Sequence, residues 1–480
     1  MKKESYIKKE DRKKILLLCD DIRAHSGVAH MGRELITNTA HRYNWVNIGG
    51  SVKHPDEGKR FDLCEDTNKH IGIEDSSVFI YPVTGYGTPE LLRGMLLREK
   101  PDAIFIITDP RYWTWLFDME AEVRKHIPII YLNIWDNYPA PIYNKTFYES
   151  CDALLGISKQ TVNINKLVLG DKGDNKVIGY VPHGVDPKVF RPLTVEEREG
   201  EEYTSFVSKM NKEKDIEFTV LYNSRNIRRK QVPDTILAFK HFVDGLPEGK
   251  KKKAMLLLHT QAVDGNGTDL PAVIELLAPE SQGYNIHFTG GPLPPEHMNY
   301  LYNLADTTIL LSSNEGWGLA LTESLLTGTP FIANVTGGMQ DQMRFIKDGK
   351  WMELDKDFPS NHRGTITECG PWAFPVYPTS RSLVGSPTTP YIWDDRCDPE
   401  HATIRLREIY DMPTQEREAA GMKGLEWATG PEAGFTSPIM GERVIENIDR
   451  LFAEWTPRES SELILAGDLE ENNINHSLIY

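Results

Sequence analysis

The chain of 480 residues holds 54 Lys and Arg against 70 Asp and Glu, which gives a formal net charge of −16 at pH 7. Its length exceeds what a single hydrophobic core ordinarily serves, so we expect two domains of roughly 200 residues with a cleft between them. A composition that is 40% hydrophobic and 26% charged excludes a disordered protein. The acidic balance also opposes nonspecific binding of polyanions, although it leaves a local basic groove open.

The first residues and the short apolar runs predict a cytoplasmic protein without stable membrane insertion. The basic segment 1–14 is followed by the apolar run Ile15 to Cys19 and then by two aspartates, which is not a signal-peptide pattern. No apolar run approaches the roughly 18 residues that a membrane-spanning helix needs. The five cysteines are far apart in the sequence, and we expect them to be reduced structural thiols.

Short apolar runs alternate with helical stretches through the first 200 residues. This rhythm is typical of parallel strands connected by helices and predicts an α/β fold with a doubly wound sheet. We assign residues 1–200 to an N-terminal Rossmann-like domain. Its expected strands are 15–19, 45–48, 78–83, 103–108, 129–134, 153–157 and 177–181.

A second series of apolar runs begins after a charged interval. Residues 194–215 lack an apolar run and predict a linker or a surface helix, and we assign the linker to 201–216. A second Rossmann-like domain is predicted over 217–440, so that the two domains face a cleft. Its expected strands are 218–222, 255–258, 286–289, 308–311 and 331–333.

The last part of the chain departs from this rhythm. Residues 350–399 are rich in Pro, Gly, Ser and Trp and predict a long irregular excursion from the second domain. Helical periodicity predicts a helix over 441–456. Residues 457–480 mix Glu and Asn with isolated apolar residues and are expected to form an acidic tail.

The most informative segment follows the strand expected at 308–311. The chain turns through 312–318, and a helix is expected to begin at Leu319. At such a junction, free backbone N–H groups and the positive end of the helix dipole meet at the carboxyl edge of the sheet, where they favour an anionic phosphate. Gly316 and Gly318 allow a close approach there.

Two carboxylates accompany this junction. Glu315 lies in the turn and Glu323 lies one turn into the helix, so we expect both on the same wall of the cleft. Carboxylates accept hydrogen bonds from the hydroxyl groups of a sugar or a ribose. Each residue alone is commonplace, because a glutamate in a first helical turn is often only a partner of the helix dipole. Together they predict a site for phosphate and hydroxyl groups.

This segment resembles the Glu-x7-Glu signature of family-four retaining glycosyltransferases, which are nucleotide-sugar enzymes with the glycosyltransferase-B fold. The resemblance covers about residues 14–455. It implies an acceptor-binding domain first, a nucleotide-sugar domain second, and a helix at 441–456 that crosses back to the first domain. The residues that match the signature are Glu315, Gly316, Trp317, Gly318, Glu323, Gly328, Pro330, Gly337 and Gly338.

The resemblance also implies roles for residues of the donor site. Arg225 and Lys230 match the family's Arg and Lys that hold the donor diphosphate, and their charges suit a leaving pyrophosphate. Glu323 is expected to bind the ribose, and Glu315 is expected to orient the donor sugar. The remaining donor-binding expectations are Gly316, Trp317, Gly318 and Leu319 at the helix start, and Ser26 and Gly27, which lie where the family has a glycine-rich loop.

Two strand ends of the first domain supply further expectations. The strand at 129–134 resembles the family strand that commonly ends in His-Asp, but Trp135 and Asp136 follow it here. Trp cannot accept a hydrogen bond, so either Asp136 or Asn137 contacts the donor sugar, or that sugar differs from the common hexoses. Asp109, Trp113 and Trp135 are candidates for acceptor binding, since aromatic faces at a strand end stack on a sugar or a base or else pack in the core.

The resemblance implies transfer of a sugar from a nucleoside-diphosphate sugar, with a UDP-sugar as the expected donor, to a hydroxyl acceptor with retention of configuration. It implies no cofactor and no metal. The acceptor is expected to be a glycan or another cytoplasmic molecule. One alternative is a phage-type transferase that acts on hydroxymethylated pyrimidines in DNA, with a basic cleft drawn from Arg111, Arg225, Arg228 and Arg229 and base flipping beside Trp113. Another is a sugar-nucleotide epimerase of the same fold.

Overall fold

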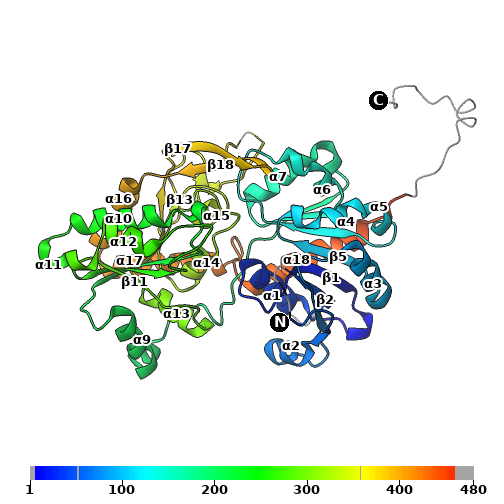
Figure 1. Ribbon diagram of the computed structural model, residues 1–480, viewed down its shortest axis with the longest axis horizontal. Coiled ribbons are helices and arrows are strands. Elements are labelled where there is room, and N and C mark those ends of the chain that lie inside the picture. The colour runs from blue at the N-terminus through cyan, green and yellow to red at the C-terminus, as the bar shows by residue number, and fades with distance from the viewer. Residues whose placement is uncertain (1–5, 51–52, 54, 357, 460–480) are drawn as a thin grey trace, which may run out of the picture.

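The computed structural model describes residues 6–50, 53, 55–356 and 358–459. Figure 1 shows two lobes: the N-terminal half of the chain forms one lobe in blue and cyan, and most of the remainder forms a second lobe in green and yellow. Each lobe contains one large sheet of mostly parallel strands. The fold is therefore an α/β fold with parallel sheets in two domains, as the sequence predicts.

The first sheet has eight strands in the order β3-β4-β2-β1-β5-β6-β7-β8. In β1 the side chains alternate between two apolar clusters, with Ile15, Leu17 and Cys19 on one face and Leu16 and Leu18 on the other. Both faces are covered by helices, which explains why these strands read as continuous apolar runs. The strands are β1 (Lys14–Asp20), β2 (Asn44–Gly50), β3 (Phe61–Asp62), β4 (Val78–Pro82), β5 (Ala103–Ile107), β6 (Ile129–Asn133), β7 (Ala153–Gly156) and β8 (Val177–Tyr180).

Helices connect the strands of this half. The side chain of Ser26 caps the first of them by accepting a hydrogen bond from the backbone N–H of Ala29 at 3.0 Å. This cap fixes the loop that follows β1. The helices are α1 (Gly27–Thr39), α2 (Cys64–Ile71), α3 (Pro89–Glu99), α4 (Thr114–Asp118), α5 (Glu120–Val123), α6 (Lys145–Glu149) and α7 (Lys159–Leu169).

The second sheet has six parallel strands in the order β11-β10-β9-β12-β13-β16. All twelve runs expected as strands in the two halves of the sequence coincide with a strand. The strands of this sheet are β9 (Phe218–Asn223), β10 (Ala254–His259), β11 (Asn285–Phe288), β12 (Thr307–Leu310), β13 (Phe331–Asn334) and β16 (Ala373–Val376).

Residues 201–216 are largely helical, which is one of the two alternatives expected for this charged interval. Helix α9 (Glu201–Asn211) buries Tyr203, Phe206 and Met210, whose spacing places them on one side of the helix. The rings of Tyr203 and Phe206 pack edge-on against Tyr300. The other helices are α8 (Val195–Glu199), α10 (Val232–Asp244), α11 (Glu248–Lys251), α12 (Leu270–Leu277), α13 (Pro295–Leu304), α14 (Leu319–Leu326), α15 (Met339–Met343), α16 (Pro399–Asp411), α17 (Thr414–Thr429) and α18 (Ser437–Glu454).

The prediction that residues 350–399 are irregular is wrong for much of this segment. Strand β16 extends the main sheet, and β17 (Ser380–Ser386) and β18 (Thr389–Arg396) form an antiparallel hairpin. The short strands β14 (Ile346–Lys347) and β15 (Lys350–Trp351) form another. The hairpin strands contain Gly and Pro and many polar residues, so they carry no apolar run for the sequence to reveal.

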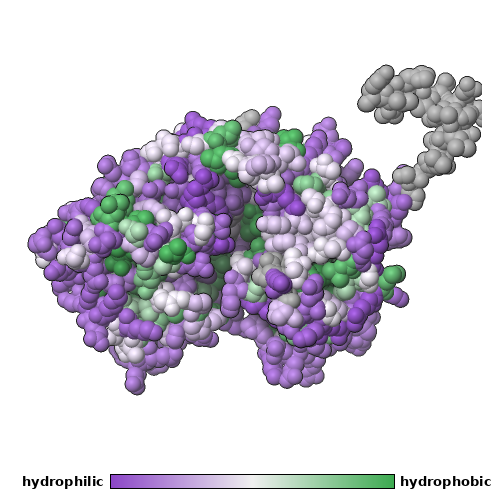
Figure 2. All heavy atoms as spheres, in the orientation of Figure 1, coloured by the Kyte–Doolittle hydropathy of each residue, from purple (hydrophilic) through white to green (hydrophobic). Residues whose placement is uncertain are grey.

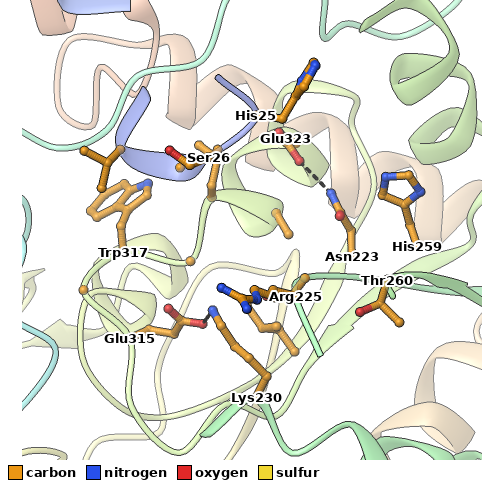
Figure 3. A pocket seen from close by; sticks show the side chains of 18 of the residues that line it. His25, Ser26, Asn223, Arg225, Lys230, His259, Thr260, Glu315, Trp317 and Glu323 are labelled. Atoms are coloured by element: carbon orange, nitrogen blue, oxygen red, sulfur yellow. Dashed lines mark hydrogen bonds and ion pairs between the residues drawn. The ribbon is translucent and has the colours of Figure 1, made fainter. Parts of the chain in front are cut away.

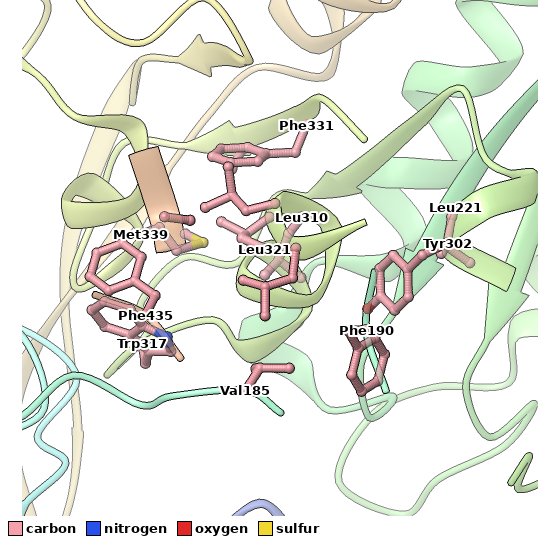
Figure 4. Packing of buried hydrophobic residues seen from close by; sticks show 14 of the residues in the cluster. Val185, Phe190, Leu221, Tyr302, Leu310, Trp317, Leu321, Phe331, Met339 and Phe435 are labelled. Carbon is pink, nitrogen blue, oxygen red and sulfur yellow. The ribbon is translucent and has the colours of Figure 1, made fainter. Parts of the chain in front are cut away.

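The chain returns to the first domain at its end. Helix α18, orange in Figure 1, packs on α1 and β8, and Asp449 accepts hydrogen bonds from Arg42 and Tyr43 at 2.6 Å each. Where the two connections cross, the backbone N–H of Val185 donates to the carbonyl of Phe435 at 3.1 Å. Figure 4 shows Phe435 against Trp317 and Val185 below Leu321, and all four belong to one apolar cluster. The two domains are thus joined by a packed crossing. Within the described ranges no helix has the length and apolar composition to cross a membrane.

Candidate active site between the two domains

A cavity of 1110 Å³ lies between the carboxyl edges of the two sheets. The space-filling view shows the hollow between the lobes (Figure 2). Parallel strands of both domains end here, which is where open α/β sheets place their binding residues. The lining residues used below are Ser26, Gly27 and Asp136 from the first domain, and Asn223, Arg225, Arg229, Lys230, His259, Thr260, Glu315 and Glu323 from the second.

Glu315 is buried against two cations. Its Oε1 accepts hydrogen bonds from the ammonium group of Lys230 and from Ser312 Oγ at 2.9 Å, and its Oε2 accepts one from Arg229 Nη1 at 3.0 Å. Figure 3 shows the Lys230 and Glu315 side chains meeting at one end of the pocket. Burial alone would raise the pKa of Glu315, but Lys230 and Arg229 together lower it to about 2. The carboxylate therefore stays charged at neutral pH.

Asp136 approaches the same cluster from the other domain. Its Oδ2 lies 3.6 Å from Arg229 Nε, so Arg229 lies between Asp136 and Glu315. Burial raises the pKa of Asp136, and the charge of Arg229 opposes this increase. The sequence predicted a site role for Asp136, whereas it offered Arg229 only for the basic cleft of the DNA alternative.

Glu323 has neutral partners instead. Its Oε2 accepts hydrogen bonds from Tyr302 Oη at 2.5 Å and from Asn223 Nδ2 at 3.1 Å. Burial raises the pKa of Glu323 to about 7. Two glutamates eight positions apart thus have opposite electrostatic environments.

The glycines of the junction serve the packing of the two domains as well as the helix start. A Cβ on Gly316 would lie 2.5 Å from the carbonyl oxygen of Ile134 in the first domain. Gly318 has a φ of 87° and precedes the first residue of α14, Leu319, which lines the cavity. Gly316 therefore lets the loop that carries Glu315 touch the opposite domain.

Arg225 lines the cavity but does not join Glu315. Its Nε pairs with Asp264 Oδ2 at 2.7 Å, and its side chain is 60% exposed. The 3₁₀ turn Arg228–Lys230 instead brings Arg229 and Lys230 to Glu315. The sequence Arg-Asn-Ile-Arg-Arg-Lys offers three arginines, and only the conformation of this turn decides which of them faces the carboxylate.

None of the three residues predicted to bind the acceptor lines the cavity. Trp113 is fully buried and donates from Nε1 to the carbonyl of Ile107 at 3.1 Å. Trp135 is also buried in the core of the first domain, and its Nε1 donates to the carbonyl of Asn137 at 2.8 Å. Asp109 forms an ion pair with Arg111. Burial of both indoles argues against direct stacking of Trp113 or Trp135 on an acceptor, while an acceptor contact of Asp109 stays a prediction.

The remaining predicted donor-site residues, Trp317, Ser26 and Gly27, lie at the cavity wall. Trp317 lies at the cavity wall, but its indole is 3% exposed and donates to Thr322 Oγ1 at 2.8 Å, so it mainly supports α14. Ser26 donates to Asp20 Oδ2 at 2.5 Å, and Gly27 has open space around its Cα. His259 and Thr260, at the end of β10, line the cavity and were not predicted; a strand end facing the cleft was the available signal.

Comparison with a known family gives a match that lies mainly in the second domain. Residues 196–353 match the family model of Glycosyl transferases group 1. A D-inositol 3-phosphate glycosyltransferase of Thermomonospora curvata is 26% identical over 191 residues, which are 40% of this chain and 42% of that protein. The chain matches less than half the length of the curated relatives that resemble it.

Solved structures show the likeness of the whole fold. Sucrose-phosphate synthase from Thermosynechococcus elongatus superposes with a TM-score of 0.64 and 15% identity, covering 92% of this chain and 100% of that chain. HepE of Anabaena, solved with UDP and glucose, gives 0.60 and 13%, covering 92% and 100%. Residues 196–353 therefore resemble glycosyl transferases group 1, and the chain has a fold of the glycosyltransferase-B type.

Proposed function

We propose that the protein transfers a sugar from a nucleoside-diphosphate sugar, most simply a UDP-sugar, to a hydroxyl acceptor. The observation that carries the proposal is the pair Glu315 and Glu323 in one interdomain cavity, the first charged beside two cations and the second held by neutral donors. The names of the similar proteins agree with it, since the curated relatives are glycosyltransferases and HepE was solved with UDP and glucose.

The arrangement supports a role for each donor-site residue. In this proposal Glu323, at the start of α14, accepts hydrogen bonds from the ribose hydroxyls. Lys230, Arg225 and the free N–H groups at that helix start would stabilise the charge that develops on the departing diphosphate, which is where such groups lower a barrier most. Arg225 can reach the phosphates because its side chain is largely exposed.

Retention of configuration is part of the proposal. Both oxygens of Glu315 are engaged by cations, and Asp136 is beside Arg229, so neither carboxylate is placed as a free nucleophile. We infer attack by the acceptor hydroxyl from the face that the diphosphate leaves, with Glu315 orienting the sugar. We further propose that no metal is required, because Lys230, Arg225 and Arg229 supply the positive charge.

The acceptor is proposed to be a glycan or another small hydroxyl compound. The DNA alternative loses its support, because Arg111 pairs with Asp109, and Trp113, the residue expected beside a flipped base, is buried. A sugar-nucleotide epimerase would use the same donor site without an acceptor, so only the product distinguishes it.

The test is product analysis by proton NMR after incubation with UDP-glucose, UDP-galactose, UDP-N-acetylglucosamine or GDP-mannose and a panel of acceptors. We expect release of the nucleoside diphosphate and an acceptor-linked sugar whose anomeric coupling matches that of the donor. Inversion at the anomeric carbon would refute the retaining mechanism. Conversion of the donor into an epimer without transfer would replace the proposal by the epimerase alternative.

A further inference from the structure

The hairpin β17–β18 bonds to both domains although it belongs to the second. Figure 1 shows it in yellow, extending from the second lobe toward α7. On the first domain, the backbone N–H of Trp393 donates to the carbonyl of Tyr138 at 2.8 Å, and Tyr143 Oη donates to the carbonyl of Tyr391 at 3.0 Å. The end of the hairpin adds Arg111 Nη1, which donates to Thr388 Oγ1 at 2.8 Å.

Asp395 connects the two domains through one buried carboxyl group. Its Oδ2 accepts hydrogen bonds from Asn137 Nδ2 at 3.0 Å and from Thr336 Oγ1 at 2.8 Å. Its Oδ1 accepts one from Ser360 Oγ at 3.2 Å. Asn137 belongs to the first domain and the other two donors belong to the second, and Asp395 itself is 0% exposed.

The neighbouring residue holds the loop of Glu315. Asp394 Oδ1 accepts hydrogen bonds from Ser313 Oγ at 3.1 Å and from Asn314 Nδ2 at 3.0 Å. The backbone N–H of Asp395 donates to the carbonyl of Ser313 at 2.9 Å. The hairpin therefore binds Asn137, which is next to Asp136. It also binds Ser313 and Asn314, the two residues before Glu315.

This arrangement is not the one that stability alone favours. A buried carboxyl group with neutral partners costs desolvation that well-packed apolar residues would avoid. The three hydrogen bonds instead fix the orientation of the Asp395 carboxyl group, because each donor lies in a different segment of the chain. The geometry therefore defines the spacing between the loops of Asp136 and Glu315.

We propose that Asp395 is a positioning residue that sets Asp136 and Glu315 across the cleft for sugar transfer; this inference rests on the proposed function. Asp395 acts through Asn137 and, with its neighbour, through the 312–318 loop. A misplacement of about 1 Å at a reacting centre lowers a rate by about 100-fold. Donor binding should be affected less, because the partners of Glu323 are Tyr302 and Asn223 rather than the hairpin.

The test compares Asp395→Ala and Asp395→Asn with Asp411→Ala, which removes an exposed carboxylate that pairs with Arg407 on α16. We expect Asp395→Ala to lower kcat by about 100-fold while the KM for the donor changes by less than about threefold. Asp395→Asn keeps the shape of the side chain and one acceptor oxygen, so its kcat should lie between those of the wild type and Asp395→Ala. Hydrogen–deuterium exchange should accelerate over 133–138 and 312–318 in the alanine variant, and Asp411→Ala should match the wild type in every readout.

The other outcomes distinguish failure of the positioning role from failure of the proposed function. A folded Asp395→Ala protein whose kcat stays within about twofold of the wild type would overturn the positioning role while leaving the proposed function intact. Unchanged exchange in both loops would overturn the structural link whether or not the protein is active. Absence of transfer by the wild type with every donor would overturn the proposed function instead. If Asp395→Ala does not fold, Thr336→Val removes one donor to Oδ2, and the same kcat and exchange criteria apply to it.

Discussion

Arg229 Nη1 donates a hydrogen bond to Glu315 Oε2 at 3.0 Å, and this contact defines the charged end of the cavity. Lys230 meets the other oxygen of the same carboxylate. Asp136 reaches the cluster from the opposite domain, with its Oδ2 3.6 Å from Arg229 Nε. Both domains therefore contribute to one group of charges, and changes within it should affect stability and activity together.

Substitution of Glu315 should reduce both activity and stability. Glu315→Gln removes the charge that balances Lys230 and Arg229, and breaking a buried ion pair from one side typically costs about 3 kcal/mol. We expect transfer to fall below detection and the unfolding free energy from urea denaturation to fall by about that amount. The matched control Glu418→Gln changes an exposed glutamate of α17 and should leave both unchanged. Full activity of Glu315→Gln would contradict the site assignment.

Substitutions of Arg225 and Arg229 should differ in their effect on the free energy of unfolding. Arg225→Ala removes a pair in which the arginine side chain is 60% exposed and the Asp264 side chain is 4% exposed. Asp264 keeps the hydrogen bond from the backbone N–H of Asn266 at 2.9 Å, so we expect the unfolding free energy to fall by only about 1 kcal/mol. The KM for the donor should rise about tenfold, since a charge-assisted contact to phosphate is lost. Arg229→Ala should lower stability as well as kcat. Equal stability of the two variants would show that Arg229 is not part of a buried charge cluster.

Glu323 should make stability dependent on pH. Its pKa in the folded protein is raised by burial to about 7 from an ordinary value of 4.5, so its contribution is fully present below pH 4.5 and is lost as the pH rises through 7. We expect the unfolding free energy of the wild type, relative to Glu323→Gln, to fall by about 3 kcal/mol across this interval. Denaturant titrations at several pH values measure this difference. Parallel curves for the two proteins would contradict the raised pKa.

Trp113 should behave as a core residue rather than as an acceptor ligand. Trp113→Ala leaves a cavity beneath the first sheet, and truncation of a buried Trp typically costs about 3–5 kcal/mol. Trp113→Phe keeps most of the packing and should retain transfer with an unchanged KM for the acceptor. A raised acceptor KM in a stable Trp113→Phe protein would restore the direct role that the sequence suggested.

Removal of divalent cations should leave transfer intact. Among the residues that the structure describes, no three His, Cys, Asp or Glu side chains form a group that could hold a metal ion. The proposed mechanism relies on Lys230 and Arg225 instead. We expect equal initial rates in EDTA and in magnesium buffer, with a loss of rate on chelation counting against the mechanism.

The sequence predicts the sheets well because their strands are buried on both faces. Runs such as Ile15 to Cys19 and Met255 to Leu258 are continuously apolar, and this pattern survives without any knowledge of tertiary contacts. The hairpin β17–β18 escapes the same reading because its strands are largely polar and partly exposed. The residues to which it hydrogen-bonds lie far away in the sequence, so no local sequence pattern predicts these contacts.

The sequence predicts the site residues that belong to a motif. It does not predict those whose place in the site depends on the conformation of a turn. Glu315 and Glu323 follow from the strand, turn and helix order around them. Arg229 does not, because the 3₁₀ turn determines which arginine points inward. Trp113 and Trp135 follow strands in positions that suit binding or packing equally. Only the fold shows that both indoles turn into the core.

The most direct test of the central claim is calorimetric titration of UDP into the wild-type protein and into Arg225→Ala. We predict stoichiometric binding of UDP to the wild type and about tenfold weaker binding to the variant, since one phosphate-binding cation is lost. UDP-glucose in place of UDP tests whether the sugar side of the cavity is also engaged. Failure of UDP, GDP, ADP, dTDP and CDP alike to bind the folded wild type would contradict the account.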